Sequence, residues 1–280
     1  MKYGKKKDPP EHLGFVYRDG EHDYHSDRVE MTGVTTVLGV AGSPGGLMQY
    51  AANYGAARAF CLKTPAGLKE ALENLPKLDT PAARELDKAY PEWKDARTAH
   101  ARNTGRRAEA GTDNHALAEA WEQGQEILIG TPELDHYKTW YAENVEKTLF
   151  VERPLFSKRM FVGGTPDGGF LMKDGKRLIN DKKFKDSLFD NKAFWQMAAY
   201  RMMIEEMLQD EATPVRLEWK DGSVEEFASP KKYLESIVGV DWDGSVVLTI
   251  NGKGVVPSYR FAYEEDRDSF ESVLKIYKRI

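Results

Sequence analysis

The chain has 280 residues, 41% of them hydrophobic, which is enough for one large domain or two small ones with a buried core. Its single cysteine excludes an intramolecular disulfide, an iron–sulfur cluster and an all-cysteine zinc site, so any metal must bind oxygen and nitrogen ligands. The formal net charge of −5 argues against a general nucleic-acid coat, because such binding depends on a cationic surface. An enzyme that acts on nucleic acid stays open, since it needs carboxylates for a cation and only local basic patches for its substrate.

The sequence gives no sign of a membrane partner. It contains no run of about 18 or more apolar residues. The basic start, Met1 to Lys7, leads into Asp8-Pro9-Pro10 rather than into an apolar signal core. These features predict a cytoplasmic protein.

The first half of the chain is predicted to be mostly helical. Residues 14–25 have the pattern of a β-hairpin, with Asp19-Gly20 as its turn. The stretch from about 34 to 145 is rich in Ala, Leu, Glu and Lys and is interrupted by prolines. This pattern predicts several helices separated by breaks.

The second half has the pattern of short strands with two helices. Strands are predicted at residues 149–156, 160–172, 177–184, 215–219, 237–242, 246–250 and 259–263, and helices at about 192–208 and 266–277. No internal repeat or low-complexity linker divides the chain. We therefore expect one mixed α+β domain over residues 1–280, with a helical half at about 34–145 and a catalytic sheet core at about 146–280.

Two acidic segments are predicted to meet across a hairpin. The segment Lys173-Asp174-Gly175 suits a three-residue loop with its glycine in the left-handed position, which pairs Met172 with Lys176. The same register places Asp167 directly opposite Asp181.

Three charged side chains therefore converge, because Lys183 points to the same side of its strand as Asp181. Two facing carboxylates repel one another unless a divalent cation lies between them, and oxygen ligands suit Mg²⁺ or Mn²⁺. Such a cation polarises a phosphoryl oxygen and lowers the pKa of bound water, while a Lys183 ammonium would orient the water and offset the charge of the transition state. The pattern predicts hydrolysis of a phosphodiester. The alternative is an ordinary Lys–Asp pair on a solvated hairpin.

Several short motifs occur in a fixed order between about residues 33 and 205. They are Gly33–Leu38, Gly111-Thr112-Asp113-Asn114-His115 with Glu119, Pro166-Asp167, Asp181-Lys182-Lys183 and Gln196-Met197-Ala198-Ala199-Tyr200. In this order they resemble the signatures of the PD-(D/E)XK nuclease superfamily, and specifically of its RecB-like exonuclease branch, which includes phage-type and mitochondrial genome maintenance exonucleases. Their joint occurrence, rather than any one motif, carries the resemblance.

The resemblance implies a restriction-endonuclease-like core, in which helices flank a central mixed β-sheet. It implies a metal-dependent DNA exonuclease of recombination, repair or genome processing, with a recombination or replication protein as a partner and, if a phage encodes it, the host cytoplasm as its location. The catalytic residues would be Asp167, Asp181 and Lys183, and the ligands of Mg²⁺ or Mn²⁺ would be His115, Asp167 and Asp181.

The other matched side chains have two interpretations each. Gln196 and Tyr200, four residues apart, would bind a nucleic-acid strand or pack in the core. Glu119 shares a helical face with His115 and would support the metal ligands, although a lone helical histidine is more often structural. Glu152 would be a further ligand, a group that supports the ligands, or an exposed strand residue.

Two positions depart from the family pattern. Lys182 stands where the residue is usually apolar, and Phe184 stands where a hydroxyl residue often follows the lysine. Alternation along the strand turns Lys182 away from Asp181, so Lys183 is the predicted catalytic lysine. These departures and the acidic net charge motivate an alternative function, a catalytically weak or inactive nuclease-fold module that binds DNA or a protein.

Overall fold

The computed structural model describes residues 10–20, 22–41, 88, 110–185, 191–237 and 241–279. The chain divides into two compact units, Met1–Ala41 with Asp113–Ile280, and Gly42–Thr112. Between residues 42 and 109, the predicted helical half lies outside the described residues, apart from residue 88. The expectation of one domain therefore stays a prediction.

The described residues form a mixed α+β fold, as predicted, with three β-sheets. The central sheet has the strand order β13-β12-β9-β8-β5. Its strands are β5 (Val145–Val151), β8 (Gly168–Met172), β9 (Arg177–Phe184), β12 (Gly244–Asn251) and β13 (Gly254–Arg260). β9 and β12 are parallel, and the other neighbours are antiparallel. No helix in the described part of the chain is long and apolar enough to cross a membrane.

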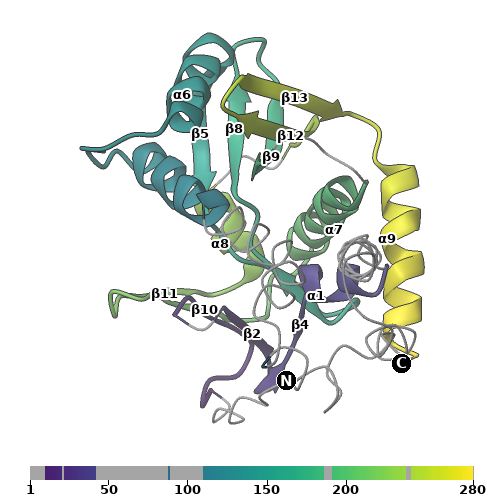
Figure 1. Ribbon diagram of the computed structural model, residues 1–280. Coiled ribbons are helices and arrows are strands. Elements are labelled where there is room, and N and C mark those ends of the chain that lie inside the picture. The colour runs from purple at the N-terminus through teal and green to yellow at the C-terminus, as the bar shows by residue number, and fades with distance from the viewer. Residues whose placement is uncertain are drawn as a thin grey trace. The chain divides into compact units, whose positions relative to one another are not determined.

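Helices cover both faces of the central sheet (Figure 1). Leu178 and Leu248 pack on one face with α6 (Pro132–Asn144). Ile179 of β9 and Val247 of β12 pack on the other face with α7 (Lys192–Met207). Each is a chain neighbour of Leu178 or Leu248, so its side chain points to the opposite side of the sheet. Because both faces are buried, β12 is apolar along most of its length rather than alternating with polar residues.

Two smaller sheets and four further helices, one of them at residues 110–122, also belong to the described fold. One sheet contains β1 (Phe15–Arg18), β2 (Asp23–Ser26), β3 (Val29–Glu30), β10 (Val215–Glu218) and β11 (Val224–Phe227); the other contains β4 (Thr32–Gly33), β6 (Leu155–Ser157) and β7 (Val162–Gly164). The other three helices are α1 (Val34–Gly39), α8 (Pro230–Ile237) and α9 (Glu264–Tyr277). The antiparallel pairing of β1 with β2 confirms the predicted first hairpin.

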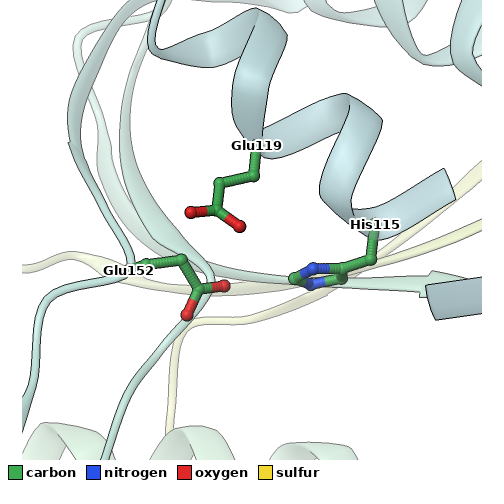
Figure 2. A group of neighbouring side chains, drawn as sticks. All are labelled: His115, Glu119 and Glu152. Atoms are coloured by element: carbon green, nitrogen blue, oxygen red, sulfur yellow. The ribbon is translucent and has the colours of Figure 1, made fainter. Parts of the chain in front are cut away.

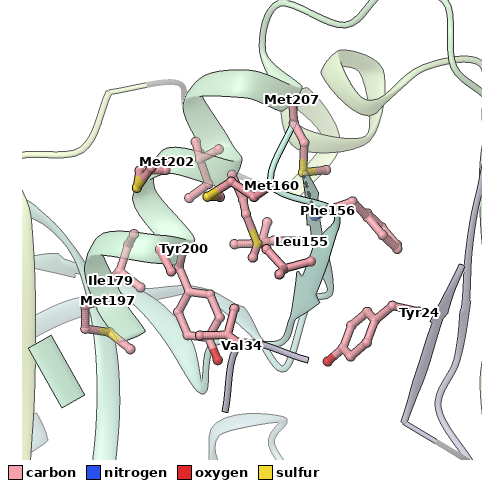
Figure 3. Close-up of a cluster of buried hydrophobic side chains, with 14 of the residues drawn as sticks. Tyr24, Val34, Leu155, Phe156, Met160, Ile179, Met197, Tyr200, Met202 and Met207 are labelled. Atoms are coloured by element: carbon pink, nitrogen blue, oxygen red, sulfur yellow. Dashed lines mark hydrogen bonds between the residues drawn. The ribbon is translucent and has the colours of Figure 1, made fainter. Parts of the chain in front are cut away.

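The main hydrophobic core forms around α7 (Figure 3). The methionines of α7, among them Met197, Met202 and Met207, pack with Leu155 and Phe156 of β6. Unbranched methionine side chains adapt to the irregular space between a helix and two sheets.

The second hairpin has the predicted register. Gly168 pairs with Asn180 and Leu171 with Arg177, and the amide of Met172 donates to the carbonyl of Lys176 at 2.8 Å. Gly175 has the expected positive φ of 87°. Asp167, one residue before Gly168, therefore lies across from the residue after Asn180, which is Asp181.

Three strand predictions differ from the structure. The segment predicted as one strand at 149–156 is β5 and β6, and the segment 160–172 is β7 and β8. Both are interrupted next to a proline, Pro154 or Pro166, where the chain lacks an amide donor for the ladder. The strand predicted at 237–242 is wrong in its described part, because α8 begins at Pro230, a residue favoured in the first helical turn, and ends at Ile237.

The close approach of β7 to α7 gives a test of this packing. A Cβ added at Gly164 would lie 2.5 Å from Cε1 of Tyr200, so we expect Gly164→Ala to lower the free energy of unfolding by about 1–3 kcal/mol. At Gly39, the last residue of α1, an added Cβ meets nothing within 4 Å, so Gly39→Ala serves as the control and should change stability by less than about 1 kcal/mol. Urea unfolding measures both, and equal effects would contradict the close packing.

Candidate metal centre

Asp167 is held in the gap between β7 and β8. Thr165, two residues earlier, makes two hydrogen bonds. Its hydroxyl bonds to the Tyr24 hydroxyl at 2.7 Å, and its carbonyl accepts from the Tyr200 hydroxyl at 3.1 Å. Oδ2 of Asp167 accepts from the Lys182 amide at 2.6 Å. The Lys182 amide thus holds the Asp167 carboxylate, and the two tyrosines hold the backbone two residues before it.

The same Asp167 oxygen lies 2.9 Å from Nε2 of His115. Residues 110–122 are helical, and this segment, the His115 helix, brings the imidazole to the end of the sheet. Burial opposes ionisation of both groups, but their hydrogen bond holds the pKa of Asp167 well below its usual range and raises the pKa of His115. The structure therefore brings together two of the three predicted ligands.

Asp181 and Lys183 lie on the same side of β9, as the strand pattern predicts. Lys183 Nζ donates to Asp181 Oδ1 at 2.8 Å, and Asp181 is fully buried. Burial raises the pKa of Asp181, the charge of Asp167 raises it further, and Lys183 opposes both effects. Burial would lower the pKa of Lys183, but the carboxylates of Asp181 and Asp167 raise it above its ordinary value. Lys183 is thus an ammonium held beside the two aspartates.

Oδ2 of Asp181 is buried and has no hydrogen-bond partner among the described residues. An unsatisfied carboxylate oxygen in such a place is costly unless a ligand or a solvent molecule completes it. The oxygen is therefore a point at which a bound group would be stabilised.

A second set of side chains converges more closely than the predicted ligands do. His115, Glu119 and Glu152 each offer a ligand atom, and these atoms all lie within 4.8 Å of one another. Within the described parts of the chain this is the one group of three or more histidine, cysteine or acidic side chains that meets this spacing. Figure 2 shows the two carboxylates turned toward the imidazole.

Local structure explains how these three residues meet. His115 and Glu119 are four residues apart in one helix and so lie on one face. Glu152 follows the last residue of β5 and has a φ of 46°, the left-handed region that non-glycine residues rarely adopt. Its amide donates to the Asp167 carbonyl at 3.3 Å. The turned backbone points the Glu152 side chain at the helix instead of along the sheet (Figure 2).

The donor set fits a divalent cation. Burial raises the pKa of Glu152 to about 8, with a further contribution from the charge of Asp167 and opposition from His115. Two carboxylates and an imidazole are suitable ligands for Mn²⁺, and the carboxylates also suit Mg²⁺. Because Nε2 of His115 faces Asp167, the other ring nitrogen, Nδ1, is available for a cation. A carboxylate that orients a histidine ligand in this way also increases its basicity.

Asp167 contacts His115, and Asp181 contacts Lys183, while Glu119 and Glu152 converge with His115. The predicted roles of Asp167 and Asp181 as metal ligands stay predictions, and Glu119 and Glu152 are further candidates. The sequence contains the signal for Glu119, its spacing of four from His115. It contains no comparable signal for Glu152, whose position depends on the strand break before Pro154.

Tyr200 lies in the hydrophobic core, whereas a substrate-binding side chain would have to be exposed. It is 2% exposed, and its ring packs in the main core (Figure 3). Gln196 is half-buried and donates to the Tyr200 hydroxyl at 2.7 Å. The pair therefore positions Thr165 and, through it, Asp167, and no buried ring can stack on a nucleic-acid base.

A cleft of about 920 Å³ borders the cluster. Glu119 and Glu152 line one part of it, and Arg153, Trp219 and Lys220 line another. The cleft is open to a molecule larger than an ion, and a ligand in it would contact two of the three candidate metal ligands.

The His115–Asp167 hydrogen bond can be tested in the metal-free protein. Removing the charge of Asp167 in Asp167→Asn keeps the shape of the side chain, and we expect the pKa of His115 to fall, because that charge is what raises it. NMR titration of the imidazole measures the shift. Asp268→Asn, at an exposed position on α9, is the control and should leave the His115 titration unchanged. An unchanged titration in Asp167→Asn would contradict the contact.

No model of a known protein family matches the sequence, and a search of curated proteins finds no match either.

Proposed function

We propose that the protein is a metal-dependent nuclease that hydrolyses phosphodiester bonds of DNA, acts as an exonuclease, and serves recombination, repair or genome processing. One observation carries the proposal: an ammonium group, Lys183, is paired with a buried carboxylate, Asp181, near a convergent cluster of cation ligands. The preference for an exonuclease and for DNA rests on the family resemblance of the motifs.

The cation would be Mn²⁺ or Mg²⁺, held by His115, Glu119 and Glu152, with Asp167 orienting the imidazole. When bound, it would polarise the phosphoryl oxygen and promote ionisation of water at neutral pH. The fit is supported by the spacing of the ligand atoms and by the raised pKa of Glu152, since a cation relieves repulsion among the carboxylates.

Lys183 would act on the substrate itself. Its ammonium is fixed by the 2.8 Å hydrogen bond to Asp181, so its remaining donors have restricted directions. A raised pKa keeps it charged at neutral pH. A fixed positive group of this kind orients the attacking water and offsets negative charge that develops on the phosphate. Asp181 contributes by holding the lysine in place.

The cleft beside Glu119 and Glu152 supports entry of a nucleic-acid strand. Trp219 on its wall offers an aromatic ring, the kind of group on which bases stack, and Arg153, which pairs with Glu225, lies 5.1 Å from that ring. Gln196 stays a predicted substrate contact, and Tyr200 becomes a positioning residue. A recombination or replication protein stays the predicted partner.

The alternative is a nuclease-fold module that binds DNA or a protein without efficient catalysis. Lys182, Phe184 and the acidic net charge motivate this alternative, and the structure places the first of them. That side chain lies on the opposite face from Lys183 and is paired with Glu122, so it does not compete for the substrate site. Metal-dependent turnover distinguishes the two functions.

We expect Lys183→Met to reduce nucleotide release from linear DNA with Mn²⁺ by about 10²–10³-fold, because one preorganised charged donor is lost from the reaction site. The same variant should retain Mn²⁺ binding, since Lys183 is not among the ligands. Lys275→Met, on the exposed side of α9, is the matched control and should retain activity. Full activity of Lys183→Met would exclude the catalytic assignment.

We expect Glu119→Gln and Glu152→Gln to weaken Mn²⁺ binding by at least about 10-fold each, as loss of a group at a metal site commonly does. Binding should release protons, because the pKa of Glu152 is about 8 in the metal-free protein, and affinity should decline as the pH falls below that value. Isothermal titration calorimetry in two buffers measures both effects. Glu143→Gln, an exposed residue of α6, is the control. Unchanged affinity in both site variants would show that the cation is bound elsewhere.

A further inference from the structure

A fully buried ion pair joins the His115 helix to the central sheet. Lys182 Nζ lies 2.7 Å from Oε1 of Glu122, and neither side chain has any exposed area. The Tyr137 hydroxyl donates to the same glutamate oxygen, and the tyrosine ring lies 5.8 Å from the ammonium. The other glutamate oxygen has no partner among the described residues. Glu122 therefore depends on Lys182 and Tyr137 for its stability in the interior.

Each residue of this ion pair is closely connected to the candidate metal centre. Lys182 lies between Asp181 and Lys183 in β9, and its amide donates to Asp167 Oδ2 at 2.6 Å. Glu122 lies in the same helix as His115, two helical turns further along. The pair is thus a direct connection between the strand that carries the lysine and the helix that carries the metal ligands.

One face of the His115 helix carries three ionisable groups in a row. His115, Glu119 and Glu122 are spaced by four and then three residues, so all three point toward the sheet. Their partners are different elements: His115 meets Asp167, Glu119 meets Glu152, and Glu122 meets Lys182. A slide of the helix by one residue, about 1.5 Å, would break all three contacts together.

Hydrophobic packing alone does not fix such a position. Apolar contact is non-directional, and this also holds for the apolar residues of this helix, the fully buried Ala118 and the partly buried Leu117 and Trp121, whose indole lies edge-on to Tyr137 and Tyr141. A charge-assisted hydrogen bond has a narrow range of distance and angle. A buried ion pair adds little net stability compared with apolar residues of the same size, so its presence here needs a reason other than stability.

We propose that the Lys182–Glu122 pair is a positioning device that fixes the His115 helix against β9 and so sets the distance of His115 and Glu119 from Asp167 and Glu152. The expected effect on cation binding rests on the proposed function. The expected effect on the position of the His115 helix concerns the metal-free protein. Neither residue contacts substrate or cation.

The test replaces the pair by apolar residues of similar volume, Lys182→Met with Glu122→Leu. We expect the midpoint of urea unfolding to fall only modestly, because no unpaired charge is left in the interior and only the Tyr137 hydroxyl loses its acceptor. We expect the ¹⁵N NMR signals of the His115 imidazole in metal-free protein to lose the signature of a fixed Nε2–H donor, and Mn²⁺ affinity to fall at least about 10-fold. The six histidines of the chain are distinguished by comparison with His115→Gln.

A second double variant, Lys182→Met with Glu122→Gln, keeps an acceptor for the Tyr137 hydroxyl and tests the same proposal if the first variant does not fold. The matched control is Lys231→Met with Glu211→Leu, which removes an ion pair on the surface and should change neither readout. Wild-type imidazole signals in a folded pair variant would overturn the proposal. Failure of the wild type to bind Mn²⁺ would instead refute the proposed metal site, and the imidazole signals would still decide the positioning role.

Discussion

The structure around the site depends on one constraint, the burial of two consecutive charged residues in β9, Asp181 and Lys182. They are 0% and 2% exposed, and the next residue, Lys183, is half-buried. An unpaired charge in such surroundings is strongly destabilising, so each must have a partner. Alternation sends Asp181 and Lys183 to one face, where they pair with each other, and sends Lys182 to the opposite face, where it pairs with Glu122. The position of the His115 helix follows from that second pairing.

The same constraint shapes the electrostatics of the cluster. Lys182 and Lys183 compensate Glu122 and Asp181 in direct contacts, whereas Glu119 and Glu152 share their space with one imidazole. Burial and the neighbouring carboxylates raise the pKa of Glu152 beside an open cleft, and a cluster of this kind is the arrangement on which the proposed cation site rests. An acidic net charge for the whole chain is consistent with this arrangement, because a cation, rather than lysine or arginine alone, would meet the phosphate.

Two residues of the candidate site lie where strands are interrupted. Glu152 follows β5 before Pro154, and Asp167 follows Pro166 before β8. At such breaks the side chain is released from the alternation of the sheet and can turn toward a helix, as the positive φ of Glu152 shows. Glu152 is held there by the hydrogen bond of its amide to the Asp167 carbonyl, and the backbone before Asp167 is held through Thr165 by two tyrosines.

The sequence alone determined the features that follow from local rules. A three-residue loop ending in a left-handed glycine set the register of β8 and β9, and alternation placed Lys183 beside Asp181; both are seen in the structure. Only the tertiary structure decided which partners these groups meet. Lys182 and Glu122 are 60 residues apart, and no local rule links them. Gln196 and Tyr200 have the same spacing in the sequence whether they bind a substrate or pack in the core. Only the packing of α7 shows that Tyr200 lies in the core. Periodicity gives the direction of a side chain relative to its own element, and the partner in that direction depends on how the elements pack.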